Sequence, residues 1–270
     1  MSGSPDGGKT CRVGPPRVVQ MLPEDSTFAA RLVRSRTDRY GAMSPAIWRA
    51  AEGAEEVQRA ELAQMVTRGD VVALRTGSGF AVAQLRGNDC FLDDFAVSDP
   101  GLWESDGTAL LLDCWEGVHA MGATGARVAS AGADPAKSAM LRSLGLVVGE
   151  QWWAKPVAPQ TPAAAGGQLQ GPGFRALVGP APPGYDPGGP VAFVRYLGPS
   201  GDLSEVESRA AQAGAALVVV PERPGGDREG ELESRGYEVA VQWYLGTPSR
   251  PVPGLARGEG EARRPEGVSP

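Results

Sequence analysis

The sequence contains one histidine, three cysteines and no stretch rich in lysine and arginine among its 270 residues. A single histidine, His119, is too few for a multi-histidine metal site, and it lies in no Ser-His-Asp hydrolase motif. The cysteines are odd in number and have no CxxC spacing, so we expect neither a structural zinc nor a disulfide framework. These absences predict a chain with no bound metal in a reduced, cytoplasmic compartment.

Charge and hydropathy exclude two further kinds of partner. The net charge is −6 and the isoelectric point is about 5.0, so we expect no nucleic-acid binding through phosphate contacts. No apolar run approaches the roughly 20 residues of a membrane span. The first residues, MSGSPDGGKT, lack the apolar core of a signal peptide. We therefore expect no membrane partner.

The hydropathy pattern of the first part of the chain predicts a mixed α/β (α+β) fold. A strand is expected at Arg17–Leu22, followed by helices at Pro23–Gly41 and Pro45–Val66. Short strands follow between residues 70 and 97, and a helix and a strand–helix–strand unit then end near Val157. Antiparallel strands that precede βαβ units predict a mixed central sheet flanked by helices.

Composition divides the chain into five segments. The two ends are polar, and a stretch rich in proline, alanine, glycine and glutamine separates two regions of strand and helix patterns. We expect a flexible tail at 1–15, a first domain at 16–157, a linker at 158–172, a smaller second domain at 173–247 and a disordered tail at 248–270.

The two regions contain an internal repeat. Leu141–Trp153 aligns without a gap with Leu232–Tyr244, at a constant offset of 91 residues. A coincidental match of two helix–glycine–strand segments would explain part of this similarity, but the shared Gln-Trp pair favours duplication. The identical pairs are Leu141/Leu232, Ser143/Ser234, Gly145/Gly236, Val148/Val239, Gln151/Gln242 and Trp152/Trp243.

The stretch DPGLWESDGTALLL, residues 99–112, has small residues where a helix is expected to begin. Gly107, Thr108 and Ala109 permit close approach to the backbone, and a helix N-terminus attracts anions through its free N–H groups and its dipole. Glu104 and Asp106 bring negative charge to the same place. Asp106 also suits a purely structural role as the N-cap of this helix.

In this order of elements, the segment from FLDDFAV to MLRSLGL resembles the GCN5-related N-acetyltransferase (GNAT) family, and the resemblance covers Arg17 to Val157. It implies a GNAT-like sheet followed by a partial, degenerate repeat. It also implies transfer of an acetyl group from acetyl-CoA to a primary amine on a small molecule or peptide, by direct attack. Val97 matches the backbone position that pairs with pantetheine, and Gly107, Thr108 and Ala109 match the loop that holds the pyrophosphate.

The same resemblance suggests catalytic residues. Asp94 matches a strand position that often carries the general base, and alternation along the strand places Asp93 and Asp94 on opposite faces. A strand-edge carboxylate bonded to backbone or arginine is the alternative role. The tyrosine that protonates the leaving thiolate in this family is replaced by Leu141. Lys137 is expected either to meet phosphates or to be solvated.

Two features leave the activity open. The loop before the helix of the second copy is shortened, so we expect this copy to bind no cofactor and to shape the acceptor site or complete a core. The departures at Glu104 and Leu141 favour an alternative, a catalytically silent GNAT-like module that binds a ligand or a protein. Trp48 and Tyr40 lie where the family contacts its acceptor. The internal repeat predicts a monomer or weak dimer.

Overall fold

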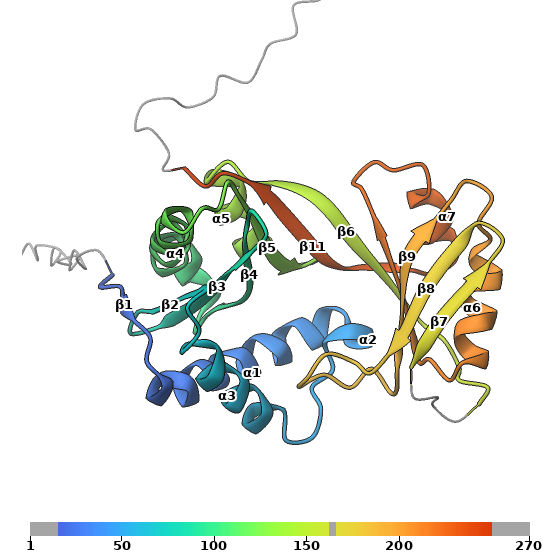
Figure 1. Cartoon of the computed structure of the whole chain (residues 1–270), viewed down its shortest axis with the longest axis horizontal. Helices are drawn as coiled ribbons and strands as arrows, with labels where there is room; N and C mark the ends of the chain where they lie inside the picture. Colours follow the sequence, from blue (N-terminus) through green and yellow to red (C-terminus); the bar gives the residue numbers. More distant parts are fainter. Residues whose placement is uncertain (1–15, 162–165, 250–270) are drawn as a thin grey trace, which may run out of the picture.

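The computed structural model describes residues 16–161 and 166–249, and the terminal tails predicted at 1–15 and over most of 248–270 lie outside them. In these residues, one sheet of eleven strands joins both parts of the chain in the order β1-β2-β3-β4-β5-β11-β6-β10-β9-β8-β7 (Figure 1). Within the described residues, no helix is long and apolar enough to cross a bilayer.

The first unit has an open sheet with helices on both faces. Its strands are β1 (Val19–Gln20), β2 (Val71–Arg75), β3 (Gly79–Arg86), β4 (Asp89–Val97) and β5 (Gly125–Ala131). Its helices are α1 (Ser26–Met43), α2 (Pro45–Trp48) and α3 (Ala54–Met65) on one face, and α4 (Thr108–Ala120) and α5 (Pro135–Ser143) on the other (Figure 1). The single helix expected over Pro45–Val66 is interrupted before Gly53, which has a φ of +70°.

The second unit repeats this order. β6 (Val147–Pro156) is the last strand of the first unit. The elements of the second unit are β7 (Gly167–Gly171), β8 (Phe174–Gly179), β9 (Val191–Leu197), α6 (Leu203–Gln212), β10 (Leu217–Glu222), α7 (Glu229–Ser234) and β11 (Glu238–Gly246). The series β7-β8-β9-α6-β10-α7-β11 follows β2-β3-β4-α4-β5-α5-β6 element by element. The repeat is therefore larger than the sequence match, and β7 occupies residues that we expected to be linker. Among residues 16–161 and 166–249, the second unit has no counterparts of α1–α3.

The two units exchange their last strands. β11 lies between β5 and β6, and β6 lies between β11 and β10, all antiparallel. Gln151 pairs with Gln242, while Trp152 pairs with Val241 and Trp243 with Glu150. Because Gln151 and Gln242 are equivalent in the repeat, an approximate two-fold axis passes between them. The matched sequence segments thus occupy equivalent places in the fold.

This exchange also joins the two hydrophobic cores. Tyr244 on β11 is fully buried in the core of the first unit, among residues of β3, β4, α4 and α5. Its repeat equivalent, Trp153 on β6, is buried in the core of the second unit. Each core is therefore completed by a large aromatic side chain that the other unit supplies, and neither unit can bury its apolar surface alone.

Candidate active site

A β-bulge on β4 places the two candidate carboxylates together. Ala81 pairs with Phe95 but Ala83 pairs with Leu92, so β4 has one residue more than β3 at this point. Leu92 and Phe95 both pack into the core beneath α4. Asp93 and Asp94 therefore both face the α1 side of the sheet. The prediction that they face opposite sides is wrong, because a bulge interrupts the alternation of a regular strand.

β4 and β5 separate at this bulge. Their parallel pairing covers only Asp89–Leu92 and Gly125–Val128, so the last residues of β4 have no backbone partner on β5. Basic side chains donate hydrogen bonds to backbone carbonyl oxygens of β4 here. Arg39 donates to the Val97 carbonyl at 3.4 Å, and Lys137 Nζ lies 3.5 Å from the Phe95 carbonyl. We call this separation of the two strands the β4/β5 opening.

Arg36 on α1 connects the carboxylates to the second unit. Its side chain is buried, and it donates to the Asp93 carbonyl at 2.8 Å and to the Tyr185 hydroxyl at 3.2 Å. Burial opposes its charge, but Tyr185, Asp94 and Asp93 together raise its pKa above the ordinary value. The guanidinium therefore stays charged and fixes the backbone at the bulge.

Asp94 has an unusual protonation equilibrium. Burial, together with the neighbouring charge of Asp93, raises its pKa to about 6, against the opposing influence of Arg36. Glu61 on α3 adds to the rise and Lys137 lowers it. A carboxylate that titrates near neutral pH is suited to accept a proton from a substrate and release it again. Because two carboxylates interact, the pair titrates as a unit.

Lys137 fills the β4/β5 opening. Its side chain is 1% exposed, and Nζ lies 4.9 Å from the centre of the Phe95 ring and 5.0 Å from that of Trp103. Burial and the nearby Arg36 lower the pKa of Lys137 to about 7. Both roles expected from the sequence, phosphate contact and a solvated charge, are wrong. The N-cap residue Asp134 accepts a hydrogen bond from the Lys137 amide and so fixes the start of α5.

The turn before α4 is more compact than a simple cap. Trp103–Gly107 forms a π-helical turn, and a Cβ on Gly107 would lie 2.6 Å from the buried Trp103 ring. Thr108 donates its hydroxyl to the Trp103 carbonyl at 3.4 Å. Asp106 is not the N-cap. Its carboxylate accepts hydrogen bonds from Thr76 at 2.6 Å and from Ser78, which hold the β2–β3 hairpin against the turn.

A groove of about 430 Å³ lies between this turn and α5. Gly107, Thr108 and Ala109 do not line it. Glu104 is the only charged residue among those that do, and its negative charge opposes a bound phosphate. The rest of the lining suits an apolar chain. The lining residues are Pro100, Gly101, Trp103, Glu104, Ala136, Ala139, Met140 and Ser143.

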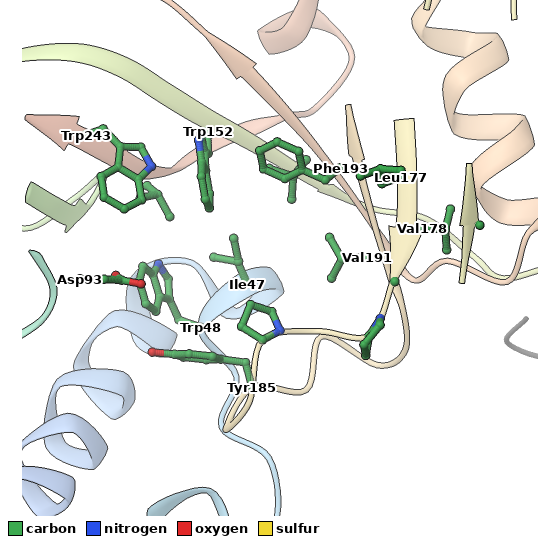
Figure 2. Close-up of a pocket in the computed structure, with 16 residues that line it drawn as sticks. Ile47, Trp48, Asp93, Trp152, Leu177, Val178, Tyr185, Val191, Phe193 and Trp243 are labelled. Atoms are coloured by element: carbon green, nitrogen blue, oxygen red, sulfur yellow. The ribbon is translucent and has the colours of Figure 1, made fainter. Parts of the chain in front are cut away.

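A cavity of about 570 Å³ lies on the other side of the sheet, where the two units meet (Figure 2). We call it the junction cavity. Of the two side chains predicted near the acceptor, Trp48 lines it, whereas Tyr40 is buried and donates to Asp134 at 2.7 Å; Trp152 lines it as well. Asp93 also lines it. The other lining residues are Ile47, Gly167, Leu177, Val178, Gly179, Pro180, Pro182, Tyr185, Val191, Phe193, Val219, Val241 and Trp243.

Arg36 and Tyr185 were not found from the sequence. Arg36 belongs to a helix with several arginines, and nothing in the local pattern separates it from the solvated ones. Tyr185 lies in a proline- and glycine-rich loop and reaches the site only because the second unit folds back on α2 (Figure 1). An isolated bridge between Ala50 and Tyr185 holds this loop in place.

No protein-family model and no curated protein sequence matches the chain. Solved structures match its fold. A Thermoplasma acidophilum protein classed as an acetyltransferase superposes with a TM-score of 0.56 at 13% identity, over 85% of this chain and 98% of that one. A GCN5-related N-acetyltransferase from Sphaerobacter thermophilus gives 0.53 at 11% identity, over 87% and 96%. The chain thus has the GNAT fold, in a mixed sheet flanked by helices.

Replacing Lys137 by methionine is expected to stabilise the fold by about 1–3 kcal/mol at pH 6–7, because the buried cation is removed. The folded pKa of about 7 is below the ordinary value of 10.5, so the unfolded chain binds more protons between these values. The contribution of Lys137 to the free energy of unfolding of the wild type therefore becomes more favourable as pH rises above 7. The extra stability of the methionine variant over the wild type should shrink over the same range. Urea unfolding from pH 6 to 10 measures this, with exposed Arg142→Met as the control. A stability difference between variant and wild type that grows with pH would contradict a buried Lys137 with a lowered pKa.

Proposed function

We propose that this chain transfers an acetyl group from acetyl-CoA to a primary amine, with the carboxylate pair Asp93–Asp94 as the base. One observation carries the proposal. The bulge places both carboxylates on one side of β4, between the junction cavity and the β4/β5 opening, and the pKa of Asp94 is raised to about 6. The GNAT fold of the chain supports the class of reaction.

In this proposal the acceptor amine lies in the junction cavity with its nitrogen at Asp93. The ammonium loses a proton to the carboxylate pair, and the neutral amine attacks the thioester carbonyl. The C–N bond forms and the C–S bond breaks. The nitrogen loses its second proton to water, and the departing thiolate takes a proton from water, so the product is the neutral amide and the free thiol. Leu141, which is fully buried, supplies no acid. No covalent enzyme intermediate is involved.

The cofactor site follows from the groove beside the π-helical turn. The methylene groups of a pantetheine chain suit the apolar lining of this groove, and the free edge of β4 near Val97 offers its amides backbone partners once Arg39 releases the carbonyl. We assign Gly107, Thr108 and Ala109 to shaping the turn on which the diphosphate rests. The exchange of β6 and β11 within one chain supports a monomer or weak dimer, because both cores are completed internally.

A second function is favoured by the position of Lys137. Its buried amine fills the β4/β5 opening, and Glu104 lines the groove, so a chain that binds an amine without transferring an acetyl group is the alternative. Release of free thiol from acetyl-CoA by the full chain, with and without a panel of primary amines, separates the two. Amine-dependent release supports transfer. Amine binding without release supports the silent module.

Glu104→Gln is expected to tighten acetyl-CoA binding about two- to five-fold, because a negative charge at the groove is removed. The interaction free energy of an exposed charge near a helix N-terminus is roughly 0.3–1 kcal/mol. Calorimetric titration of both proteins with acetyl-CoA measures the change. Glu116→Gln, at an exposed position of α4 that is not part of this groove, is the matched control. Equal affinity of the Glu104 variant and wild type would place the phosphates elsewhere.

A further inference from the structure

The junction cavity has two aromatic walls that face each other. Figure 2 shows Trp243, Trp152 and Phe193 on the sheet side and Trp48 and Tyr185 on the side of α2 and its neighbouring loop. Within the first wall, the ring of Trp152 lies 5.0 Å from Phe193 and 5.5 Å from Trp243. Within the second, Trp48 lies 5.5 Å from Tyr185. Neighbouring rings within each wall are steeply inclined, at 76° for Trp152–Phe193 and 74° for Trp48–Tyr185, so a flat molecule between the walls meets both ring faces and ring edges.

Hydrogen bonds fix the rings before any ligand arrives. Trp48 donates its indole N–H to the Ala240 carbonyl at 3.0 Å, and Trp152 donates to Glu150 at 2.6 Å. The Tyr185 hydroxyl accepts from the buried Arg36. Trp243 is the exception, since its indole nitrogen is buried and has no partner among the described residues. A preorganised cavity binds with a smaller loss of side-chain entropy.

Charge in the cavity is confined to one end. Asp93 is the only lining residue with a formal charge, and Figure 2 shows it at the Trp48–Trp243 end, away from Leu177 and Val178. A cation is therefore attracted to that end by the carboxylate and by the indole faces. The opposite end is apolar, so a second charge or several hydroxyl groups would be buried there without partners.

We propose that the junction cavity binds a primary amine carried on a single aromatic or flat apolar body, with the ammonium at Asp93 and the body between Trp152 and Trp48. The proposal rests on the proposed function for its chemistry, but binding itself requires no acetyl-CoA. It selects against amino sugars with several ammonium groups. The second unit provides β8 and β9 as walls, and in the part of the chain that the structure describes no counterparts of α1–α3 cover this face.

The test is calorimetric titration of the full chain, without acetyl-CoA, with three probes: 2-phenylethylamine, its neutral analogue 2-phenylethanol, and a tri-amino sugar. We expect the amine to bind at least tenfold more tightly than the alcohol, and the sugar not to bind. Asp93→Asn is expected to remove the preference for the amine while the affinity for the alcohol stays the same. A merely structural role of Asp93 would change both affinities equally.

A second variant keeps the test independent of folding. Leu177 is 46% exposed and lines the cavity, so Leu177→Trp fills it from the surface and should abolish binding of the amine. Val147→Trp, at a strand position that is 63% exposed and outside the cavity, is the matched control. Equal affinity for amine and alcohol, tighter binding of the sugar, or no binding of the amine at millimolar concentration would overturn the proposal.

The outcomes also separate this proposal from the proposed function. Binding of 2-phenylethylamine without thiol release from acetyl-CoA would leave the ligand class standing and refute acetyl transfer. Amine-dependent thiol release with the tri-amino sugar, and none with 2-phenylethylamine, would support acetyl transfer and refute the ligand class.

Discussion

Tyr244→Ala is expected to destabilise the whole chain by about 3–5 kcal/mol. The side chain is fully buried in the core of the first unit although it belongs to the last strand of the second, so its loss leaves a large cavity beside α4 and β4. Because β6 and β11 are exchanged, both units should unfold in one transition. Unfolding in urea, followed by tryptophan fluorescence and by far-ultraviolet circular dichroism, measures the loss and the cooperativity.

Two variants control this experiment. Trp153→Ala, at the equivalent position of β6, is expected to cost a similar amount through the second core. Tyr196→Ala removes an aromatic side chain that is 49% exposed on β9, and we expect a loss below about 1 kcal/mol. Two separate transitions in any of these proteins, with only one of them shifted, would show that the units fold independently and that the exchange does not join them.

Asp94→Asn is expected to lower kcat for amine acetylation by about 10²- to 10⁴-fold, which is the usual contribution of a general base. Wild-type activity should rise with pH through about 6, because the carboxylate accepts a proton only when it is ionised. The Asp94→Asn variant should no longer show this rise of activity with pH. Asp93→Asn is expected to raise KM as well, because Asp93 lines the junction cavity.

Stability distinguishes a lost base from a damaged fold. Since the folded pKa of Asp94 is raised, the folded chain binds more protons than the unfolded chain between pH 3.8 and about 6, and stability from this group falls as pH rises through that range. Asp94→Asn should therefore be at least as stable as wild type at pH 7–8 while it is inactive. Asp89→Asn on the same strand is the control. An active Asp94 variant would contradict the role of the pair.

The order of elements could be predicted from the sequence because each depends on local patterns. Val71–Arg75 and Gly79–Arg86 alternate or are bounded by turn residues, and Gly145 and Gly236 end helices with a positive φ. The repeat was visible because the exchanged strands β6 and β11 lie in equivalent surroundings. The exchange of β6 and β11 could not be predicted, because a strand with the same hydropathy pattern can pair with its own unit's sheet or with the sheet of the other unit.

The candidate site was predicted less well, because its decisive features are not local. The bulge at Asp93–Asp94 depends on the register between β3 and β4, which the hydropathy of one strand does not define. Lys137 lies on an ordinary short helix, and only the separation of β4 from β5 gives its amine a place to be buried. Gly107 lies against the Trp103 ring, a contact that the sequence did not indicate, and its role toward a cofactor stays a prediction.

Calorimetric titration of the full chain with acetyl-CoA tests the central claim, a cofactor site in the groove beside α5, most directly. Ala139 is exposed and lines the groove, so Ala139→Trp fills it, and exposed Ala120→Trp at the end of α4 is the matched control. We predict micromolar binding by wild type and by the Ala120 variant, and none by the Ala139 variant. Equal binding by all three, or no binding by wild type at millimolar acetyl-CoA, would contradict the claim.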